Sequence, residues 1–202
     1  MARRLTRRIC ASILHLMQNT MKRFTLLALS AALLINSLGA WAAETGTGAP
    51  DAKAAASESF QIRNQKFGDL LRPEDASGAN GARIVLYSAQ LWKCMTWKLH
   101  PAGAELFQVQ NHFTSKTFAA KDQGAPLAVV QSPWSRDAKE RPAWRFTKLP
   151  DGLYQITDPA SGKALTADSA GGGGVRIVLA PWQKQPEQKW ELLKTDPAKL
   201  TM

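Results

Sequence analysis

The chain has 202 residues, of which 45% are hydrophobic and 21% are charged, and its mean hydropathy is −0.25. These values are typical of a soluble globular protein and exclude a collagen, a wholly disordered chain and a polytopic membrane protein. The net charge of +10 suggests a nucleic-acid or anionic-membrane partner. However, six basic residues and no acidic ones precede Ala43, and the rest of the chain has 20 basic against 16 acidic residues. A remainder of +4 is ordinary for a secreted domain, so we do not expect nucleic acid as a partner.

The N-terminal region has the features of a secretory signal peptide. Basic Lys22 and Arg23 precede an apolar run over 24–39, and Ala40-Trp41-Ala42 places small residues at a cleavage site. The run is short for a membrane span, which needs about 20 residues. We therefore predict cleavage after Ala42 or Ala43, a secreted or periplasmic location, and no stable membrane span after cleavage. A signal-anchor helix is the alternative.

The remaining boundaries follow from composition. Residues 1–20 hold a second basic cluster, so either Met21 is the true start or the chain has a long basic leader. Ala, Gly and polar residues without apolar periodicity over 44–58 predict a flexible linker. The expected organisation is a leader over 1–43, this linker, one domain over 59–195 and a tail over 196–202. Because Cys94 is the one cysteine beyond the leader, no disulfide can form within the domain.

An internal repeat organises the domain. The segment Phe60–Asn64 returns as Phe107–Asn111 and as Tyr154–Asp158, at steps of 47 and 47 residues. A tryptophan followed by alternating residues returns as well, at positions 97, 144 and 190, with steps of 47 and 46. Two independent landmarks with one period predict three equivalent units, over 59–105, 106–152 and 153–195.

Each unit reads as four short strands between turn residues, without a helical stretch that carries capping signals. The predicted strands span 60–64, 69–72, 83–87, 95–100, 106–111, 116–120, 127–131, 143–149, 154–157, 163–167, 175–179 and 189–193. An open solenoid usually has more units, and a propeller usually has at least four blades. The sequence thus predicts an all-β protein, a β-trefoil of three four-stranded repeats of about 47 residues. Trp97, Trp144 and Trp190 would be equivalent anchors of one shared core.

The third repeat resembles that of the ricin-type β-trefoil lectin domain. Tyr154–Asp158 is followed by Ser161-Gly-Lys-Ala-Leu165 and by Gln188-Lys-Trp190, which matches the Q-x-W triplet that closes each unit of that family. The other two repeats have Met95-Thr96-Trp97 and Pro142-Ala143-Trp144 at this place. The resemblance covers about 59–195 and implies carbohydrate binding without catalysis.

The chain departs from the family at its sugar-binding positions. The carboxylate that directly follows the strand leucine in sugar-binding members is replaced, and so is the aromatic after the third strand in two of the repeats. The former positions hold Arg72, Ala119 and Thr166, and the latter hold Tyr87, Gln131 and Ala180. The family's common cysteine pair is absent too, so no repeat has a complete site by the strict motif.

A shifted sugar site is an alternative, because a carboxylate and a tryptophan recur in two loops of every repeat. The aspartates are Asp75, Asp122 and Asp168, and the tryptophans are Trp92, Trp134 and Trp182. A flat aromatic face stacks on the C–H face of a pyranose, and a carboxylate binds its hydroxyls. The third repeat has the fullest set, with Gln188 and with Lys184 and Gln185 at the rim, while the first adds Tyr87. Equally, such an aspartate can shape its own turn, a loop tryptophan can cap the barrel, and Gln188 can position the turn.

We therefore predict a secreted, non-catalytic, lectin-like protein whose partner is a glycan or polysaccharide. The alternative is a protein-interaction module on the same scaffold, such as a toxin accessory subunit or an inhibitor. An anionic polymer bound through the residual charge is a third possibility. No nucleophile–base pair, phosphate loop or metal-ligand spacing around His100 or His112 is present, so we expect no enzyme activity, no cofactor and no metal.

Overall fold

The computed structural model describes residues 57–121, 126–170 and 174–202, and they form an all-β domain. The described residues form twelve strands and five short 3-10 turns, and no α-helix occurs among them. The turns are η1 (Glu74–Ala76), η2 (Lys93–Met95), η3 (Ala138–Glu140), η4 (Pro186–Gln188) and, after the last strand, η5 (Pro197–Lys199). The predicted signal peptide, the linker up to residue 56 and Asp122 lie outside the described residues.

Each repeat contributes four strands, close to the predicted bounds. The first repeat has β1 (Glu58–Asn64), β2 (Leu70–Pro73), β3 (Ile84–Tyr87) and β4 (Thr96–Gly103). The second has β5 (Leu106–Asn111), β6 (Thr117–Ala120), β7 (Leu127–Ser132) and β8 (Ala143–Lys148). The third has β9 (Tyr154–Thr157), β10 (Ala164–Asp168), β11 (Arg176–Ala180) and β12 (Lys189–Lys194).

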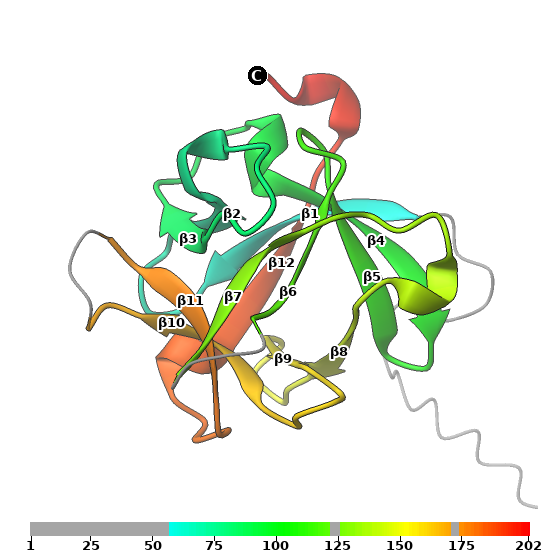
Figure 1. The fold of residues 1–202 in the computed structure, drawn as a ribbon. Coiled ribbons are helices and arrows are strands. Elements are labelled where there is room, and N and C mark those ends of the chain that lie inside the picture. The colour runs from blue at the N-terminus through cyan, green and yellow to red at the C-terminus, as the bar shows by residue number, and fades with distance from the viewer. Residues whose placement is uncertain (1–56, 122–125, 171–173) are drawn as a thin grey trace, which may run out of the picture. The chain divides into compact units, whose positions relative to one another are not determined.

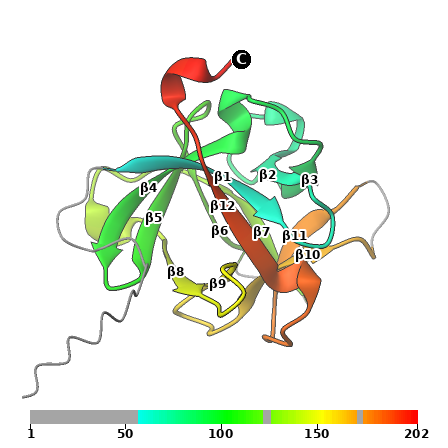
Figure 2. The same cartoon turned by 180° about the vertical axis from the view of Figure 1, so that it is seen from behind.

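The first and fourth strands of the repeats close into a six-stranded antiparallel barrel (Figure 1). Strand β1 pairs with β12 and β4, β5 pairs with β4 and β8, and β9 pairs with β8 and β12. Figure 2 shows β12 beside β1, where the last repeat meets the first. Because the ring is complete, these strands leave no open edge.

The second and third strands of each repeat form hairpins at one end of the barrel. These hairpins are β2–β3, β6–β7 and β10–β11, and they also pair with one another. Arg176 lies opposite Val85, Val178 lies opposite Ala128, and a bridge joins Arg83 to Val130. Six barrel strands and three hairpins confirm the predicted β-trefoil.

The three repeated tryptophans are buried in the core at equivalent positions. Trp97, Trp144 and Trp190 are 0%, 2% and 0% exposed. Their indole N–H groups donate to the carbonyl oxygens of Leu71, Phe118 and Leu165, at 2.9, 3.2 and 3.1 Å. Each tryptophan thereby ties a barrel strand to the hairpin of its own repeat, which confirms its predicted role as a core anchor.

A polar residue at the end of the first strand of each repeat shapes the following turn. The side-chain oxygen of Asn111 accepts from the backbone N–H groups of Phe113 and Thr114, at 3.0 and 3.1 Å. Its amide nitrogen donates to the carbonyl of Cys94, 2.9 Å away, in the loop before Trp97. Asn64 makes the same kinds of contact in its own turn. The amides of Asn64 and Asn111 thus hold their turns against a loop of the neighbouring repeat, whereas Asp158 bonds only within its own turn. The pockets lie where these turns meet the neighbouring repeats.

The predicted tail packs against the first repeat. The N–H of Thr201 donates to the carbonyl of Leu91 at 2.8 Å, and the N–H of Lys93 donates to the carbonyl of Thr201 at 3.0 Å. Thr201 pairs with Trp92, so the end of the chain lies next to that loop. Within the described part of the chain, no helix is long and apolar enough to cross a membrane.

Candidate functional site

Three surface pockets occupy equivalent positions in the three repeats. Three parts of the fold line each pocket. They are the residue that follows the buried Leu or Phe of the second strand, the segment that leads up to the buried tryptophan of the same repeat, and the turn after the first strand of the next repeat. Arg72, Ala119 and Thr166 line the pockets of the first, second and third repeats, whose volumes are about 440, 650 and 490 Å³. The fold therefore provides one candidate site per repeat, and the side chains decide what each can bind.

The first-repeat pocket brings a predicted aspartate and a predicted tryptophan together. Its lining comes from the end of β2, the η1 turn (Glu74–Ala76), the loop up to η2 (Lys93–Met95), the β5–β6 turn and the chain end. The lining residues are Arg72, Asp75, Ala76, Trp92, Cys94, Phe113 and Met202.

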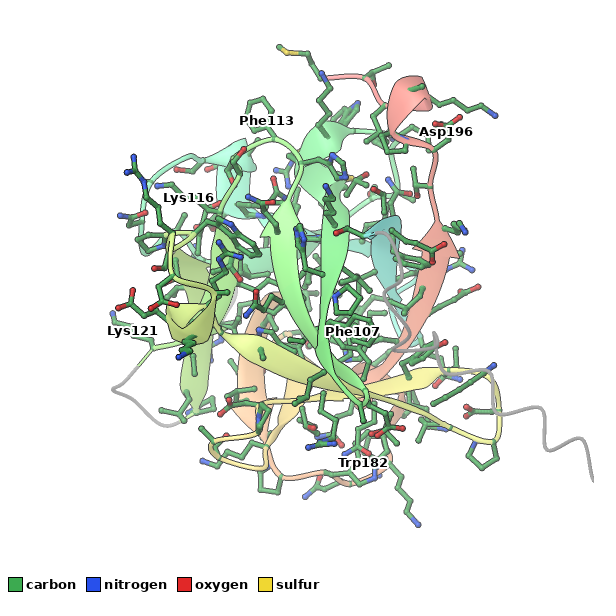
Figure 3. All side chains as sticks on the ribbon, turned by 90° about the vertical axis from the view of Figure 1, so that its right-hand side faces the viewer. Phe107, Phe113, Lys116, Lys121, Trp182 and Asp196 are labelled. Carbon is green, nitrogen blue, oxygen red and sulfur yellow. The ribbon has the colours of Figure 1, made fainter. Side chains whose placement is uncertain are left out.

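Two aromatic side chains, Trp92 and Phe113, line this pocket, and the predicted Tyr87 packs beside it without lining it. Trp92 and Tyr87 are stacked, with ring centroids 6.1 Å apart and planes inclined by 29°. Tyr87 and Phe113 are each 43% exposed, although large aromatic side chains gain free energy from burial. Figure 3 shows Phe113 and Trp182 at opposite ends of the view. Exposed aromatic faces beside a pocket are suited to stacking on a ligand.

Arg72 is the most unusual residue of this pocket, because it is charged and 8% exposed. Its guanidinium carbon lies 3.9 Å from the centroid of the Tyr87 ring, a cation–π arrangement. Its Nε atom is buried and has no hydrogen-bond partner in the described part of the chain. Burial raises the pKa of the adjacent Cys94 thiol, which therefore stays protonated near neutral pH, while the charge of Arg72 acts in the opposite direction.

The η1 turn holds Asp75 in an uncommon backbone conformation. Asp75 and Ala76 have φ angles of 52° and 53°, in the left-handed region that favours glycine. Such residues cost roughly 1–2 kcal/mol each and persist where the surrounding structure imposes them, often at binding sites. Asp75 is exposed at the pocket and forms no ion pair with a described residue.

In the third repeat, the oxygens of Asp168 are already engaged. Oδ1 accepts from the N–H of Ala170 at 2.9 Å, and Oδ2 accepts from Nε of Arg176 at 2.9 Å. The backbone hydrogen bond and the guanidinium together hold the pKa of Asp168 below its usual value. Asp168 and Gln185 line this pocket, but Trp182 and Lys184 are not among its lining residues. The structure therefore does not bring the predicted Asp168–Trp182 pair together in this pocket.

Gln188, the glutamine of the Q-x-W triplet, is buried and fully hydrogen-bonded. Its amide nitrogen donates to the carbonyl of Pro181 at 2.8 Å and to Oγ1 of Thr166 at 3.1 Å. Its amide oxygen accepts from the N–H of Gln183 at 2.7 Å. Gln188 thus holds the loop before Trp190 against β10, which fits the positioning role considered above.

In the second repeat, Trp134 is half-buried, packs against two side chains and does not line the pocket. The guanidinium carbon of Arg141 lies 4.4 Å from its ring centroid, and the His100 ring lies 5.0 Å away. Gln131 is buried and bridges two repeats, donating to the carbonyls of Ser77 and Ala79. Asp122 lies outside the described residues, so its pairing with Trp134 stays a prediction.

Sequence reasoning missed Phe113 and Met202 as pocket residues, and it treated Arg72 only as a departure from the motif. Phe113 belongs to the second repeat in sequence but lines the pocket of the first, because each pocket lies between neighbouring repeats. The spacing held a usable signal: Phe113 follows Asn111 by two residues, as Lys66 follows Asn64, and both line pockets. Among the described residues, no cluster of His, Cys, Asp or Glu could hold a metal ion.

Comparison with known proteins agrees with this architecture. Residues 140–201 match the family described as ricin-type beta-trefoil lectin domain-like, which covers the third repeat and the end of the second. No curated protein matches the sequence.

Several solved structures share the fold. A designed 3-fold symmetric protein, ThreeFoil, has a TM-score of 0.61 and 23% identity over 68% of this chain and 99% of that chain. The Rhizoctonia solani agglutinin has a TM-score of 0.59 and 16% identity over 70% of this chain and 98% of that chain. The exo-beta-1,3-galactanase 1,3Gal43A from Clostridium thermocellum has a TM-score of 0.61 and 21% identity over 68% of this chain, but only 30% of that enzyme. At these identities the likeness establishes the fold.

Proposed function

We propose that this chain, whose described domain is a ricin-type β-trefoil, is a lectin-like protein that binds a glycan or polysaccharide without catalysis, through the pocket of its first repeat. The observation that carries the proposal is the meeting of Asp75, Trp92 and Phe113 around one hollow. In the third-repeat pocket, by contrast, no aromatic side chain is among the lining residues.

The chemistry of this pocket matches that of a pyranose. A sugar ring presents C–H groups on its faces and hydroxyl groups around its edge. Aromatic faces such as those of Trp92 and Phe113 bind the former, and a carboxylate accepts hydrogen bonds from the latter. Asp75 is exposed and without an ion-pair partner among the described residues, so its oxygens can accept from a ligand. Asp168 would first have to release Arg176 and the Ala170 N–H.

The chemistry of the pocket supports binding and not turnover. Its titratable side chains are Asp75, Arg72 and Cys94, and the raised pKa of Cys94 opposes formation of a nucleophilic thiolate. Among the lining residues Asp75 supplies the one side-chain carboxylate, whereas glycoside hydrolysis commonly uses two. In the galactanase, most of the enzyme lies outside the part that this chain matches.

We further propose that the protein acts outside the cytoplasm. The basic residues before the apolar run over 24–39, and the small residues after it, support export by a cleaved signal peptide. Mass spectrometry of the protein recovered from the periplasm or medium tests this, with an N-terminus at Ala43 or Glu44 expected. A chain that keeps residues 24–39 in the membrane fraction would contradict it.

A glycan array probed with the mature chain tests the binding site. We expect selective binding that Trp92→Ala and Asp75→Asn reduce at least tenfold, since a stacked ring and a charged hydrogen bond are each worth about 1.5 kcal/mol or more. Trp182→Ala and Asp168→Asn make the same chemical changes in the third repeat and should leave binding intact. Near-UV circular dichroism confirms that each variant is folded.

The opposite pattern, with binding lost in the third-repeat variants and kept in the first-repeat variants, would place the site at Asp168 and Trp182 instead. No binding to any glycan would refute carbohydrate binding and favour the protein-interaction alternative.

A further inference from the structure

We infer that the first-repeat pocket recognises an acidic saccharide, with the Arg72 guanidinium binding the carboxylate or other oxyanion of the sugar. This inference rests on the proposed function and names its ligand class. It starts from a charge that the fold buries and that no carboxylate described in the structure neutralises.

Burial of Arg72 without a counter-ion is costly. A charged side chain in the interior is normally paired, because the loss of hydration must be offset by an opposite charge and by hydrogen bonds. The seven ion pairs among the described residues do not include Arg72. Its buried Nε–H also has no acceptor among the residues that the structure describes. Arg72 therefore lines the pocket with a charge and a donor group that no described residue of the chain pairs.

The surroundings of Arg72 fix the plane of its guanidinium group. With the central carbon 3.9 Å from the centroid of the Tyr87 ring, the group packs on an aromatic face, and Tyr87 is in turn stacked on Trp92. Arginine presents its N–H groups in a planar fork that matches the two oxygens of a carboxylate. A preorganised fork loses less entropy when the ligand binds.

The position of Arg72 also changes what the pocket can accept. A guanidinium group only donates hydrogen bonds, whereas a carboxylate only accepts them. Arg72 thus suits an anionic acceptor, while Asp75, lining the same pocket, still accepts from hydroxyls. The negative charge of Asp75 repels an anion that has no hydroxyl group to donate a hydrogen bond to it, and so disfavours the binding of such an anion. The ligand that satisfies both groups carries hydroxyls and an oxyanion together, as a uronic acid, a sialylated glycan or a sulfated sugar does.

The test compares acidic glycans with matched neutral ones. The array should hold uronate- and sialate-terminated glycans beside their carboxyl-reduced forms, and sulfated glycans beside their desulfated forms. Isothermal titration of the best ligand and its neutral counterpart then gives the affinity ratio. Because a hydrogen bond to a charged group contributes about 1.5–3 kcal/mol, we expect the acidic form to bind roughly 10- to 100-fold more tightly. Preference for the carboxylate or for the sulfate pair identifies the oxyanion.

Two variants assign the preference to Arg72. Arg72→Gln should bring the acidic ligand to the affinity of the neutral one, with little change for the neutral ligand. Arg145→Gln removes the same charge on β8 from an exposed residue that lines none of the three pockets, and it should preserve the ratio. The wild-type ratio by itself remains decisive if Arg72→Gln fails to fold.

Equal binding of acidic and neutral glycans, or a preference that survives in Arg72→Gln, would overturn the inference and leave carbohydrate binding standing. Absence of all glycan binding would overturn both.

Discussion

Replacement of Trp190 by alanine tests whether the repeated tryptophans hold the trefoil together. The indole is fully buried among residues of all three repeats, and its N–H donates to the carbonyl of Leu165 at 3.1 Å. Trp190→Ala removes the ring from the core and also leaves that carbonyl without its partner. The loss should therefore affect the whole domain and not one hairpin.

The expected cost follows from both effects. Truncation of a buried tryptophan to alanine typically costs 3–5 kcal/mol, and a buried acceptor left unpaired contributes about 1–3 kcal/mol to such losses. We predict a decrease in the free energy of unfolding of about 3–5 kcal/mol, against a typical total of about 5–15 kcal/mol. With a urea m value of about 1–3 kcal/mol/M, the midpoint should fall by roughly 2 M.

Urea denaturation followed by circular dichroism and fluorescence measures this change. Trp190→Phe keeps an apolar ring but removes the N–H donor, so it should lose only part of the stability. Trp182→Ala, at a partly exposed loop residue, should lose much less than Trp190→Ala. A decrease below about 1 kcal/mol for Trp190→Ala would refute the core assignment.

Two further predictions concern strain and pH. Ala76→Gly should raise the free energy of unfolding by about 0.5–1 kcal/mol in the same assay, because Ala76 has a φ of 53° that glycine adopts without strain. The control Ala79→Gly, at a residue with an ordinary φ, should not stabilise the domain. An unchanged or lower stability of Ala76→Gly would contradict strain in this turn. Burial lowers the pKa of His100 and His112, so the unfolded chain takes up protons more readily below about pH 6.5, and the free energy of unfolding should fall from pH 7.5 to 5.5. The double variant His100→Gln/His112→Gln should flatten this dependence, and an equally steep profile would refute the assignment.

The strand pattern could be read from the sequence because it is repeated. Alternation of apolar and polar residues within a single short strand predicts that strand only weakly. The same pattern repeated three times at a constant period gives a much stronger prediction. Trp97, Trp144 and Trp190 marked the core for this reason, and their indole contacts to the hairpins are the same in each repeat. The 3-10 turns were not predicted, because a turn of three residues has no periodicity of its own.

The site was harder to predict, because it forms between repeats. Asp168 and Trp182 both belong to the third repeat, but only Asp168 lines the pocket there. Its carboxylate accepts a hydrogen bond from Arg176. Membership of the same repeat therefore did not place both side chains at one pocket. Phe113 reaches the first-repeat pocket from the following repeat, and Met202 reaches it from the chain end. Only the folded barrel brings these segments together.

Arg72 shows a second reason why the site could not be read from a motif. The resemblance marked its position as a lost carboxylate, which weakened the case for a sugar site. The structure gives the substitution a chemical consequence, because the guanidinium is buried, lies against Tyr87 and has an unpaired Nε–H. A departure from a family pattern can therefore mark a change of ligand as well as a loss of function.

Titration of the ¹⁵N-labelled mature chain with its glycan, monitored at the tryptophan indole N–H signals, tests the proposed site most directly in the unaltered protein. We predict that the Trp92 signal shifts with saturation while those of Trp134 and Trp182 stay in place. Saturable movement of the Trp182 signal with Trp92 unchanged would place the ligand in the third repeat and contradict the account.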